Sequence, residues 1–222
     1  MAAPLVGSGG WLSGISRPAQ PRLTMATNSA PLVFRTLPYT ARVTTGPHID
    51  LKSFIRDVPD FPQPGVLFRD ITPLLQNATA FRSAIDQLTS RIAALSPDAV
   101  VGIESRGFLF GAPVAYRLGV PFAPVRKAGK LPADRMSVEY ALEYGESQLD
   151  IHADALERGQ RVVIVDDLLA TGGTAAATAK LVELLGASVA AIAVLVELAF
   201  LGGRDRLRGY QVFSLLRYDE PA

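Results

Sequence analysis

The stretch that decides the fold spans residues 162–174 and reads VVIVDDLLATGGT. Its first four residues are apolar and β-branched, which is typical of a strand buried inside a parallel sheet. Two carboxylates follow, and the stretch ends in two glycines and a threonine that lead into an alanine-rich run. A strand, a glycine loop and a helix in this order form a place where free backbone N–H groups bind an anion.

The loop half of this stretch fits a phosphate. Gly172 and Gly173 let the backbone turn tightly and bring its N–H groups close to a ligand. Thr171 and Thr174 add hydroxyl donors, and Thr174 is also placed to cap the helix that begins there. Two other phosphate loops are excluded, because no lysine follows Gly173 and because no Gly-x-Gly-x-x-Gly pattern opens the helix.

The acidic half fits a sugar. Carboxylates repel a phosphate placed beside them, whereas Asp166 and Asp167, when ionised, accept hydrogen bonds from vicinal ribose hydroxyls. The alternative is that the two acids simply end a strand and the glycines make a plain turn. The length of the motif, in its strand–loop–helix order, favours a ligand site. We therefore expect a sugar phosphate to bind here.

Outward from this stretch, apolar strand-like runs alternate with helical runs. The spacing predicts strands over 99–103, 121–125, 161–165, 189–198 and 212–216, and helices over 49–56, 79–95, 107–118 and 174–185. Nearly continuous apolar strands separated by helices predict an α/β fold with a central, mostly parallel sheet flanked by helices. Ligands of such sheets bind beyond the carboxyl ends of the strands, which here are Ile103, Val125 and Val165.

The first 48 residues differ in texture from the rest. They hold six prolines and five glycines with no sustained apolar periodicity, so we expect them to be disordered. Three interpretations stay open: translated sequence upstream of a true start at Met25 or later, which we favour, an organelle transit peptide, or a functional arm. Without this segment a cytoplasmic location is expected, whereas a transit peptide would imply an organelle.

Composition excludes several classes of protein. The 222 residues include no cysteine, which excludes disulfides, thiolate chemistry and sulfur-ligated metals. His48 and His152 stand far apart and form no metal-ligand pattern. No apolar run approaches the ~20 residues of a membrane helix. Residues 1–49 hold four of the 22 basic residues and no acid, which leaves 18 basic and 21 acidic residues in the body. We therefore expect neither a membrane nor a nucleic-acid partner.

Stretch 162–174 resembles the phosphoribosyl-diphosphate signature of the type I phosphoribosyltransferases. Four further stretches resemble the adenine-specific branch of that family: PDFPQPGVLFRDI (59–71), ESRGFLFG (104–111), RKAGKLP (126–132) and YALEYG (140–145). The resemblance runs from about Ile49 to Tyr218, and one departure is Ala133, where relatives usually have glycine. It implies a type I phosphoribosyltransferase fold over residues 49–222, with a small hood over 49–78 and a mobile lid over 127–145.

The resemblance also implies a reaction. The expected enzyme transfers the phosphoribosyl group of 5-phosphoribosyl 1-diphosphate to N9 of adenine, with inversion at the anomeric carbon, and releases AMP and pyrophosphate. Mg²⁺ is expected to arrive with the diphosphate, because it keeps much of its hydration and often binds substrate phosphates, so no protein ligands are named. A homodimer is implied, with the pyrophosphate loop near the partner. The alternatives are another acceptor base or a regulator that senses phosphoribosyl diphosphate.

By resemblance, the phosphoribosyl diphosphate has expected contacts on three loops. The 5′-phosphate is expected at Ala170, Thr171, Gly172, Gly173 and Thr174, and the ribose hydroxyls at Asp166 and Asp167. The diphosphate is expected at Ser105, Arg106, Arg126, Lys127 and Lys130. The resemblance further implies a cis peptide between Glu104 and Ser105.

The remaining expected roles concern the base and the chemistry. Adenine is expected to be read by the main chain of Leu67, with Arg69 nearby on the imidazole side. Phe61 and Phe68 fit either the base pocket or a plain core. The catalytic candidates are Glu143 as acid/base, Tyr144 beside it, and Arg106.

Overall fold

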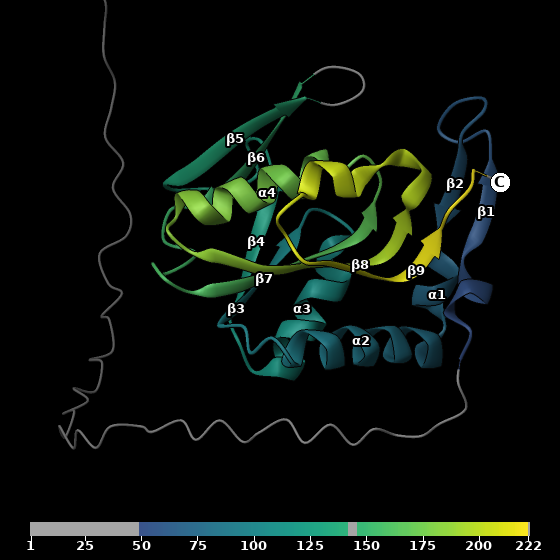
Figure 1. Cartoon of the computed structure of the whole chain (residues 1–222), viewed down its shortest axis with the longest axis horizontal. Coiled ribbons are helices and arrows are strands. Elements are labelled where there is room, and N and C mark those ends of the chain that lie inside the picture. The colour runs from purple at the N-terminus through teal and green to yellow at the C-terminus, as the bar shows by residue number, and fades with distance from the viewer. Residues whose placement is uncertain (1–48, 142–145, 222) are drawn as a thin grey trace, which may run out of the picture. The chain divides into compact units, whose positions relative to one another are not determined.

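The computed structural model describes residues 49–141 and 146–221. Within these ranges, the strands form one sheet of two strands and one of seven (Figure 1). The order of the larger sheet is β5-β6-β4-β3-β7-β8-β9. None of the helices in this part of the chain has the length and apolar character needed to cross a membrane.

The centre of the larger sheet is parallel. It consists of β4 (Phe122–Lys127), β3 (Ala99–Ile103), β7 (Arg161–Leu169), β8 (Ser188–Leu198) and β9 (Val212–Tyr218). An antiparallel hairpin, β5 (Arg135–Ala141) and β6 (Glu146–His152), joins the sheet through β4. The predicted α/β fold with a mostly parallel sheet is therefore confirmed.

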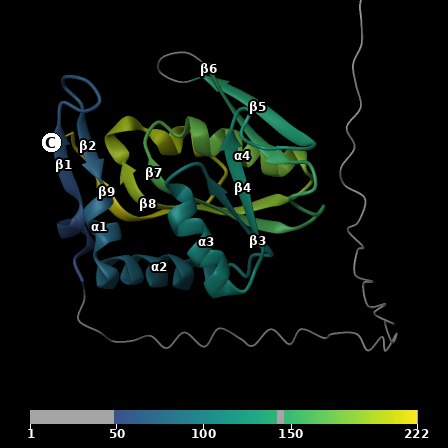
Figure 2. The ribbon, with the colours of Figure 1, turned by 180° about the vertical axis from the view of Figure 1, so that it is seen from behind.

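Helices cover both faces of this sheet, as Figures 1 and 2 show. On one face, α4 (Gly173–Leu184) packs through Leu181 against a cluster that includes Ile164. On the other face, α2 (Ala78–Ala93) and α3 (Gly107–Leu118) pack against a cluster that includes Val163 and Val165. Because neighbouring residues of β7 serve opposite clusters, the strand is buried on both sides, as its apolar run predicts.

The packing of α3 on β3 depends on two glycines. A Cβ atom at Gly102 of β3 would lie 2.5 Å from the ring of Phe122, and one at Gly111 of α3 would lie 2.9 Å from the same ring. The ring therefore occupies the volume that both missing side chains leave. This close packing fixes the start of α3, and with it the loop 104–106 that precedes the helix.

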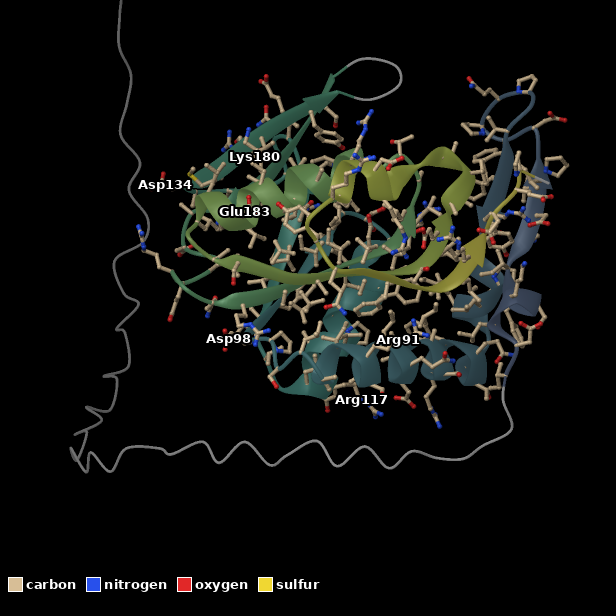
Figure 3. All side chains as sticks on the ribbon, viewed as in Figure 1. Arg91, Asp98, Arg117, Asp134, Lys180 and Glu183 are labelled. Atoms are coloured by element: carbon tan, nitrogen blue, oxygen red, sulfur yellow. The ribbon has the colours of Figure 1, made fainter. Side chains whose placement is uncertain are left out.

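The C-terminal end of α2 is connected to the sheet by a hydrogen bond. Arg91, labelled in Figure 3, donates a hydrogen bond of 2.9 Å to the carbonyl oxygen of Ser214 in β9. At the start of the same helix, the side chain of Asn77 accepts hydrogen bonds from the N–H groups of Thr79 and Ala80. A capped start and a tethered end hold α2 across the face of the sheet.

The smaller sheet lies in the segment predicted as the hood. It pairs β1 (Arg56–Pro59) with β2 (Leu67–Asp70) in antiparallel register, between the 3₁₀ helix η1 (Leu51–Phe54) and α1 (Thr72–Gln76). The helix predicted over 49–56 was too long. Ile55 already has extended backbone, with φ −100° and ψ 124°, because the chain turns there into the pairing with β2.

Three further points of the strand prediction need correction. Strand β7 was predicted to end at Val165, but it continues to Leu169, because its pairing with β8 extends to Leu169 opposite Glu197. The segment predicted as a polar lid contains β5, which the sequence interpretation missed. The last strand also continues two residues past the predicted Leu216, to Tyr218. The predicted bounds of the hood and the lid themselves stay predictions.

Candidate active site

The glycine loop lies between the end of β7 and the start of α4. Gly172 has φ +80° and is the N-terminal cap residue of α4, which begins at Gly173. Only glycine adopts such a φ at little cost, so the conformation explains this residue directly. The free N–H groups of the first turn of α4 lie at this loop, which is where an anion binds best.

Thr174 does not cap α4, contrary to the sequence interpretation. The N-cap residue of α4 is Gly172, which has no side chain that could make a capping hydrogen bond. The Thr174 hydroxyl instead lies 3.3 Å from the Tyr140 hydroxyl on β5. The structure therefore connects the glycine loop to the hairpin that carries the predicted lid.

The two carboxylates of the motif lie inside β7 rather than after it. Asp166 accepts a hydrogen bond of 2.9 Å from the Asp167 N–H group, and its carboxylate packs against Gly107 at the start of α3. Asp167 is only 5% exposed, and its carboxylate lies 2.9 Å from the Arg106 guanidinium. The structure thus brings together two predicted ribose ligands and one predicted diphosphate ligand.

Burial makes these carboxylates unusual acids. It raises the pKa of Asp166 well above the usual value, and repulsion from Asp167 adds to the rise. Burial also raises the pKa of Asp167, although the nearby Arg106 charge opposes the rise. Both groups would gain from a ligand that donates hydrogen bonds to them, as the hydroxyls of a ribose do.

Arg106 lies between the carboxylates and the hood. Its guanidinium carbon is 5.4 Å from the centre of the Phe68 ring on β2, a cation–π distance. The peptide between Glu104 and Ser105, directly before it, is cis, as the resemblance implied. Arg106 therefore contacts Asp167, a predicted ribose ligand, on one side and Phe68 of the predicted hood on the other.

Glu104 organises the neighbouring loop after β4. Its carboxylate accepts hydrogen bonds of 3.1 Å from the Arg126 side chain and from the Lys127 N–H group. Burial raises the pKa of Glu104, but these hydrogen bonds outweigh it and hold the pKa below its usual value. Arg126 also donates to the Lys130 carbonyl at 3.1 Å, while the side chains of Lys127 and Lys130 are exposed to solvent. Three of the four predicted diphosphate cations thus lie at or just after the end of β4.

A buried carboxylate that the sequence interpretation missed fixes the base of the lid hairpin. Asp150 on β6 is fully buried and accepts hydrogen bonds of 2.8 Å from Ser137 and 2.7 Å from Gln148. It also accepts the Gly129 N–H at 3.3 Å and pairs with Arg135 at 3.3 Å. Burial raises the pKa of Asp150, yet these donors lower it overall. The period-two alternation of Met136, Val138 and Tyr140 was the signal that predicts such a hairpin.

Ala133 is the position where the resemblance implied a glycine in relatives. It has φ 62°, in the left-handed region that an alanine adopts only at a cost. A glycine would take the same conformation with little strain. The departure therefore stores local strain at the base of the predicted lid.

The hood presents its loop between β1 and β2. Leu67 lies opposite Pro59, which has no N–H to donate to the Leu67 carbonyl. The rings of Phe61 and Phe68 meet edge to face, with centroids 5.1 Å apart. Because Phe61 is 51% exposed, it is not a core residue.

Arg69 has a different environment from the one expected for a base contact. It is 8% exposed, pairs with Asp57, and lies 4.0 Å from the centre of the Tyr218 ring on β9. Its guanidinium therefore connects the hood to the sheet. A direct contact between Arg69 and adenine stays a prediction.

Two predicted catalytic residues, Glu143 and Tyr144, lie outside the described residues. Over residues 49–141 and 146–221, no group of three or more His, Asp or Glu side chains is arranged to hold a metal ion.

Comparison with known proteins agrees with this geometry. The family model described as phosphoribosyl transferase domain matches residues 71–215, and the chain belongs to this family. Relatives that are 56–58% identical to the chain are adenine phosphoribosyltransferases. The adenine phosphoribosyltransferase of Synechococcus is 58% identical over 171 residues, which cover 77% of this chain and all of the relative.

Solved structures give the same result. The crystal structure of adenine phosphoribosyltransferase from Thermoanaerobacter pseudethanolicus is 56% identical, with a TM-score of 0.74 over 76% of this chain and 98% of the other. The enzyme from Saccharomyces cerevisiae, crystallised with adenine and an imino-altritol bisphosphate, is 44% identical, with a TM-score of 0.71 over 75% of this chain and 96% of the other. The fold and the branch therefore agree.

Proposed function

We infer that this chain transfers the phosphoribosyl group of 5-phosphoribosyl 1-diphosphate to N9 of adenine, forming AMP and pyrophosphate. Such a pentosyltransferase, a glycosyltransferase, returns free adenine to the nucleotide pool, which is purine salvage. The observation that carries the inference is the glycine loop and acid pair of β7, in a chain 56–58% identical to adenine phosphoribosyltransferases over almost their whole length. Each part of the site then has a physical task.

The sugar phosphate is held at the end of β7. The 5′-phosphate accepts hydrogen bonds from the N–H groups of residues 170–174, with the Thr171 and Thr174 hydroxyls as further donors. Asp166 and Asp167 accept hydrogen bonds from the ribose hydroxyls. Their raised pKa values support this role, because donors from a ligand stabilise carboxylates that burial destabilises.

Adenine lies under the hood. Its exocyclic amine donates to the Leu67 carbonyl and its neighbouring ring nitrogen accepts the Leu67 N–H. Phe68 lies beside Arg106, so that the guanidinium serves the junction of base and sugar as well as the diphosphate. Arg69 acts through the hood, since Asp57 and Tyr218 already bind its guanidinium.

The chemistry is a displacement at the anomeric carbon. The adenine N9 lone pair forms the new bond to C1, and the C1–O bond breaks with its electron pair leaving on pyrophosphate. The proton on adenine passes to a base, for which Glu143 is the candidate, with Tyr144 beside it. Ser105, Arg106, Arg126, Lys127 and Lys130 stabilise the negative charge of the leaving group.

Magnesium fits this site as a companion of the substrate. Among the described residues, Asp166 and Asp167 form a pair rather than a cluster of three acids, and Arg106 already neutralises Asp167. The donor set therefore matches an ion that binds mainly to the diphosphate. When bound there, Mg²⁺ supplies positive charge to the leaving group.

The proposal includes a homodimer that uses the exposed face of α3. Leu109 is 43% exposed and Tyr116 is 85% exposed, and their spacing of two helical turns puts them on one face. Arg106 directly precedes this helix, so a partner here would lie next to the active site. Tyr116→Glu is expected to give a monomer by light scattering, while the wild type gives a dimer.

The proposed location is the cytoplasm for the form without residues 1–48. A fusion of these residues to a fluorescent reporter tests the transit-peptide alternative, which predicts that the reporter enters an organelle.

The function is tested by a coupled assay with phosphoribosyl diphosphate, Mg²⁺ and four bases in parallel: adenine, hypoxanthine, guanine and orotate. AMP formation from adenine alone supports the proposal. Turnover of another base overturns the hood assignment, and binding without turnover indicates a regulator. Glu143→Leu is expected to keep substrate binding and lose most turnover, so an unchanged rate removes Glu143 from the mechanism.

A further inference from the structure

A second segment of backbone, distant in the sequence, is in contact with the glycine loop. It is the 3₁₀ helix η3 (Gly203–Leu207), which follows β8 and the short helix η2 (Ala199–Leu201). A Cβ atom at Gly203 would overlap the Ala170 carbonyl oxygen and lie 3.1 Å from the Leu169 side chain. A Cβ atom at Gly172 would in turn overlap the Gly203 carbonyl oxygen. The two segments therefore pack backbone against backbone.

Glycine is required at position 203 by this contact and not by the backbone conformation of the residue. Its neighbour Gly202 has φ 67°, in the left-handed region, whereas Gly203 is not among the glycines with positive φ. An alanine at 203 would adopt the backbone conformation freely but would push the Ala170 carbonyl away. The first residue of the phosphate loop is therefore held where a missing side chain allows it.

The position of η3 is fixed by an ion pair between the half-exposed Arg204 and the buried carboxylate of Glu197. Arg204 donates two hydrogen bonds to Glu197, of 2.6 and 2.8 Å, and a third of 2.9 Å to the Val212 carbonyl. Glu197 is 2% exposed and also accepts from Ser214 at 2.7 Å and Arg217 at 3.1 Å. Such a paired fork has one geometry, so Arg204 holds its neighbour Gly203 in one place.

The same ion pair is built next to the loop that η3 supports. The Glu197 backbone lies opposite Leu169, the last residue of β7 before the loop. The chain after η3 is fixed as well, because the Tyr210 hydroxyl donates a hydrogen bond of 2.7 Å to Glu183 on α4, a residue labelled in Figure 3. The glycine loop thus leads directly into α4 at one end and packs against Gly203 of η3.

We propose that η3 positions the phosphate loop, with Gly203 as the contact and Arg204 and Glu197 as positioning residues. This inference rests on the proposed function, in which the loop binds the 5′-phosphate. Hydrogen bonds to a phosphate depend on where the N–H groups lie, because they weaken steeply as the distance and angle depart from their best values. The effect is confined to ligands that carry the 5′-phosphate.

The test is Gly203→Ala, with binding of ribose 5-phosphate measured by calorimetry and KM measured separately for both substrates. Ribose 5-phosphate carries the 5′-phosphate but no diphosphate. We expect its affinity to fall at least about tenfold, and the KM for phosphoribosyl diphosphate to rise by a similar factor. The KM for adenine stays within twofold, because the hood is unaffected.

Arg204→Lys is the graded variant, since a lysine replaces the two-pronged fork by a single point charge. It is expected to change the same quantities in the same direction by about threefold, and it keeps the proposal testable if Gly203→Ala does not fold. Two matched controls lie beside η3. Gly209→Ala strains the backbone at φ 97°, outside η3 and with no atom within 4 Å of the added Cβ, and Arg208→Ala removes an exposed ion pair. Both are expected to bind ribose 5-phosphate as the wild type does.

Each outcome has a separate meaning. Unchanged binding of ribose 5-phosphate in Gly203→Ala overturns the proposal. An equal rise in KM for both substrates, in proportion to the loss of melting temperature, also overturns it, because η3 would then serve stability alone. If the wild type fails to use adenine, the proposed function fails, yet the calorimetric comparison of Gly203→Ala with Gly209→Ala still decides the role of η3.

Discussion

Two neighbouring strands of the sheet carry buried or half-buried acids at corresponding ends, and the pKa values of these acids shift in opposite directions. On β7, the neighbouring carboxylates Asp166 and Asp167 have a single arginine, Arg106, beside them. Their pKa values are raised. On β8, Glu197 receives four hydrogen bonds from two arginines and a serine, and its pKa is lowered. The donors of the first pair, the Asp167 N–H group and the Arg106 guanidinium, do not offset the effect of burial on the pKa, whereas the donors of Glu197 do.

The difference separates binding from architecture. Acids that the fold leaves short of donors are costly until a ligand supplies the missing hydrogen bonds, which is typical of a binding site. An acid whose donors all come from the protein stabilises the fold and has nothing to offer a ligand. The number of hydrogen bonds that the protein donates to a carboxylate, more than its burial, thus distinguishes a ligand-binding acid from a structural one. Four substitutions test this comparison.

The largest effect is expected from Asp167→Asn. The substitution removes the charge that receives the ribose hydroxyls and pairs with Arg106 at 2.9 Å. Hydrogen bonds to charged groups contribute about 1.5–3 kcal/mol, so kcat/KM should fall about 100-fold. Steady-state kinetics measures this, and thermal melting serves as the control for folding. A loss below threefold would contradict the binding role of the pair.

Glu197→Gln is expected to lower the free energy of unfolding at pH 7 by about 2 kcal/mol, because it weakens the hydrogen bonds from both arginines. Since the folded-state pKa is lowered, the stabilisation by Glu197 is complete above the usual value of 4.5 and is lost as pH falls through the folded pKa. The gap between wild type and variant should therefore narrow in acid. Urea unfolding between pH 3.5 and 7 checks it, and a gap that widens in acid would refute the assignment.

Asp166→Asn is expected to act in the opposite direction. It removes a charge that burial and Asp167 disfavour, so the free energy of unfolding at pH 7 should rise by about 0.5–2 kcal/mol while activity falls. Because the folded-state pKa is raised, the cost of the charge appears as pH rises from the usual value of 3.8 through the folded pKa. The gain should vanish near pH 3.8, measured in the same urea series. A destabilised variant at pH 7 would break the contrast with Glu197.

The smallest effect is expected from Arg208→Ala, which removes an ion pair with Asp205 whose side chains are 83% and 73% exposed. Exposed pairs contribute little, so the free energy of unfolding should change by less than about 0.5 kcal/mol and not depend on pH. A larger change by urea unfolding would mean that solvent exposure is a poor guide to satisfaction in this chain.

The sequence predicted the fold well where the signal was local. The runs 99–103 and 107–118 form β3 and α3 within the predicted bounds, because both are apolar and end at residues that break the pattern. The hairpin of β5 and β6 was missed although Met136, Val138 and Tyr140 alternate with polar residues, and its anchor Asp150 receives donors that only the fold assembles. The end of β7 was missed because pairing with β8 and not composition carries the strand through two aspartates.

For the candidate site, too, local sequence signals were predictive and long-range contacts were not. The motif 162–174 and the cis peptide at Glu104–Ser105 were predicted, whereas the roles of individual residues stay predictions. The contact between Gly203 and Ala170 joins residues 33 positions apart, so no local pattern contains it. Long-range contacts of this kind depend on topology, which single-residue preferences do not encode.

The shared ring of Phe122 also limits how this sequence can change over generations. Because Gly102 and Gly111 each yield their side-chain volume to that one ring, a larger residue at either glycine becomes tolerable only after Phe122 has become smaller. Changes at these three positions should therefore be inherited together. A survey of diverging sequences should find them covarying, with Phe122 as the position that changes first.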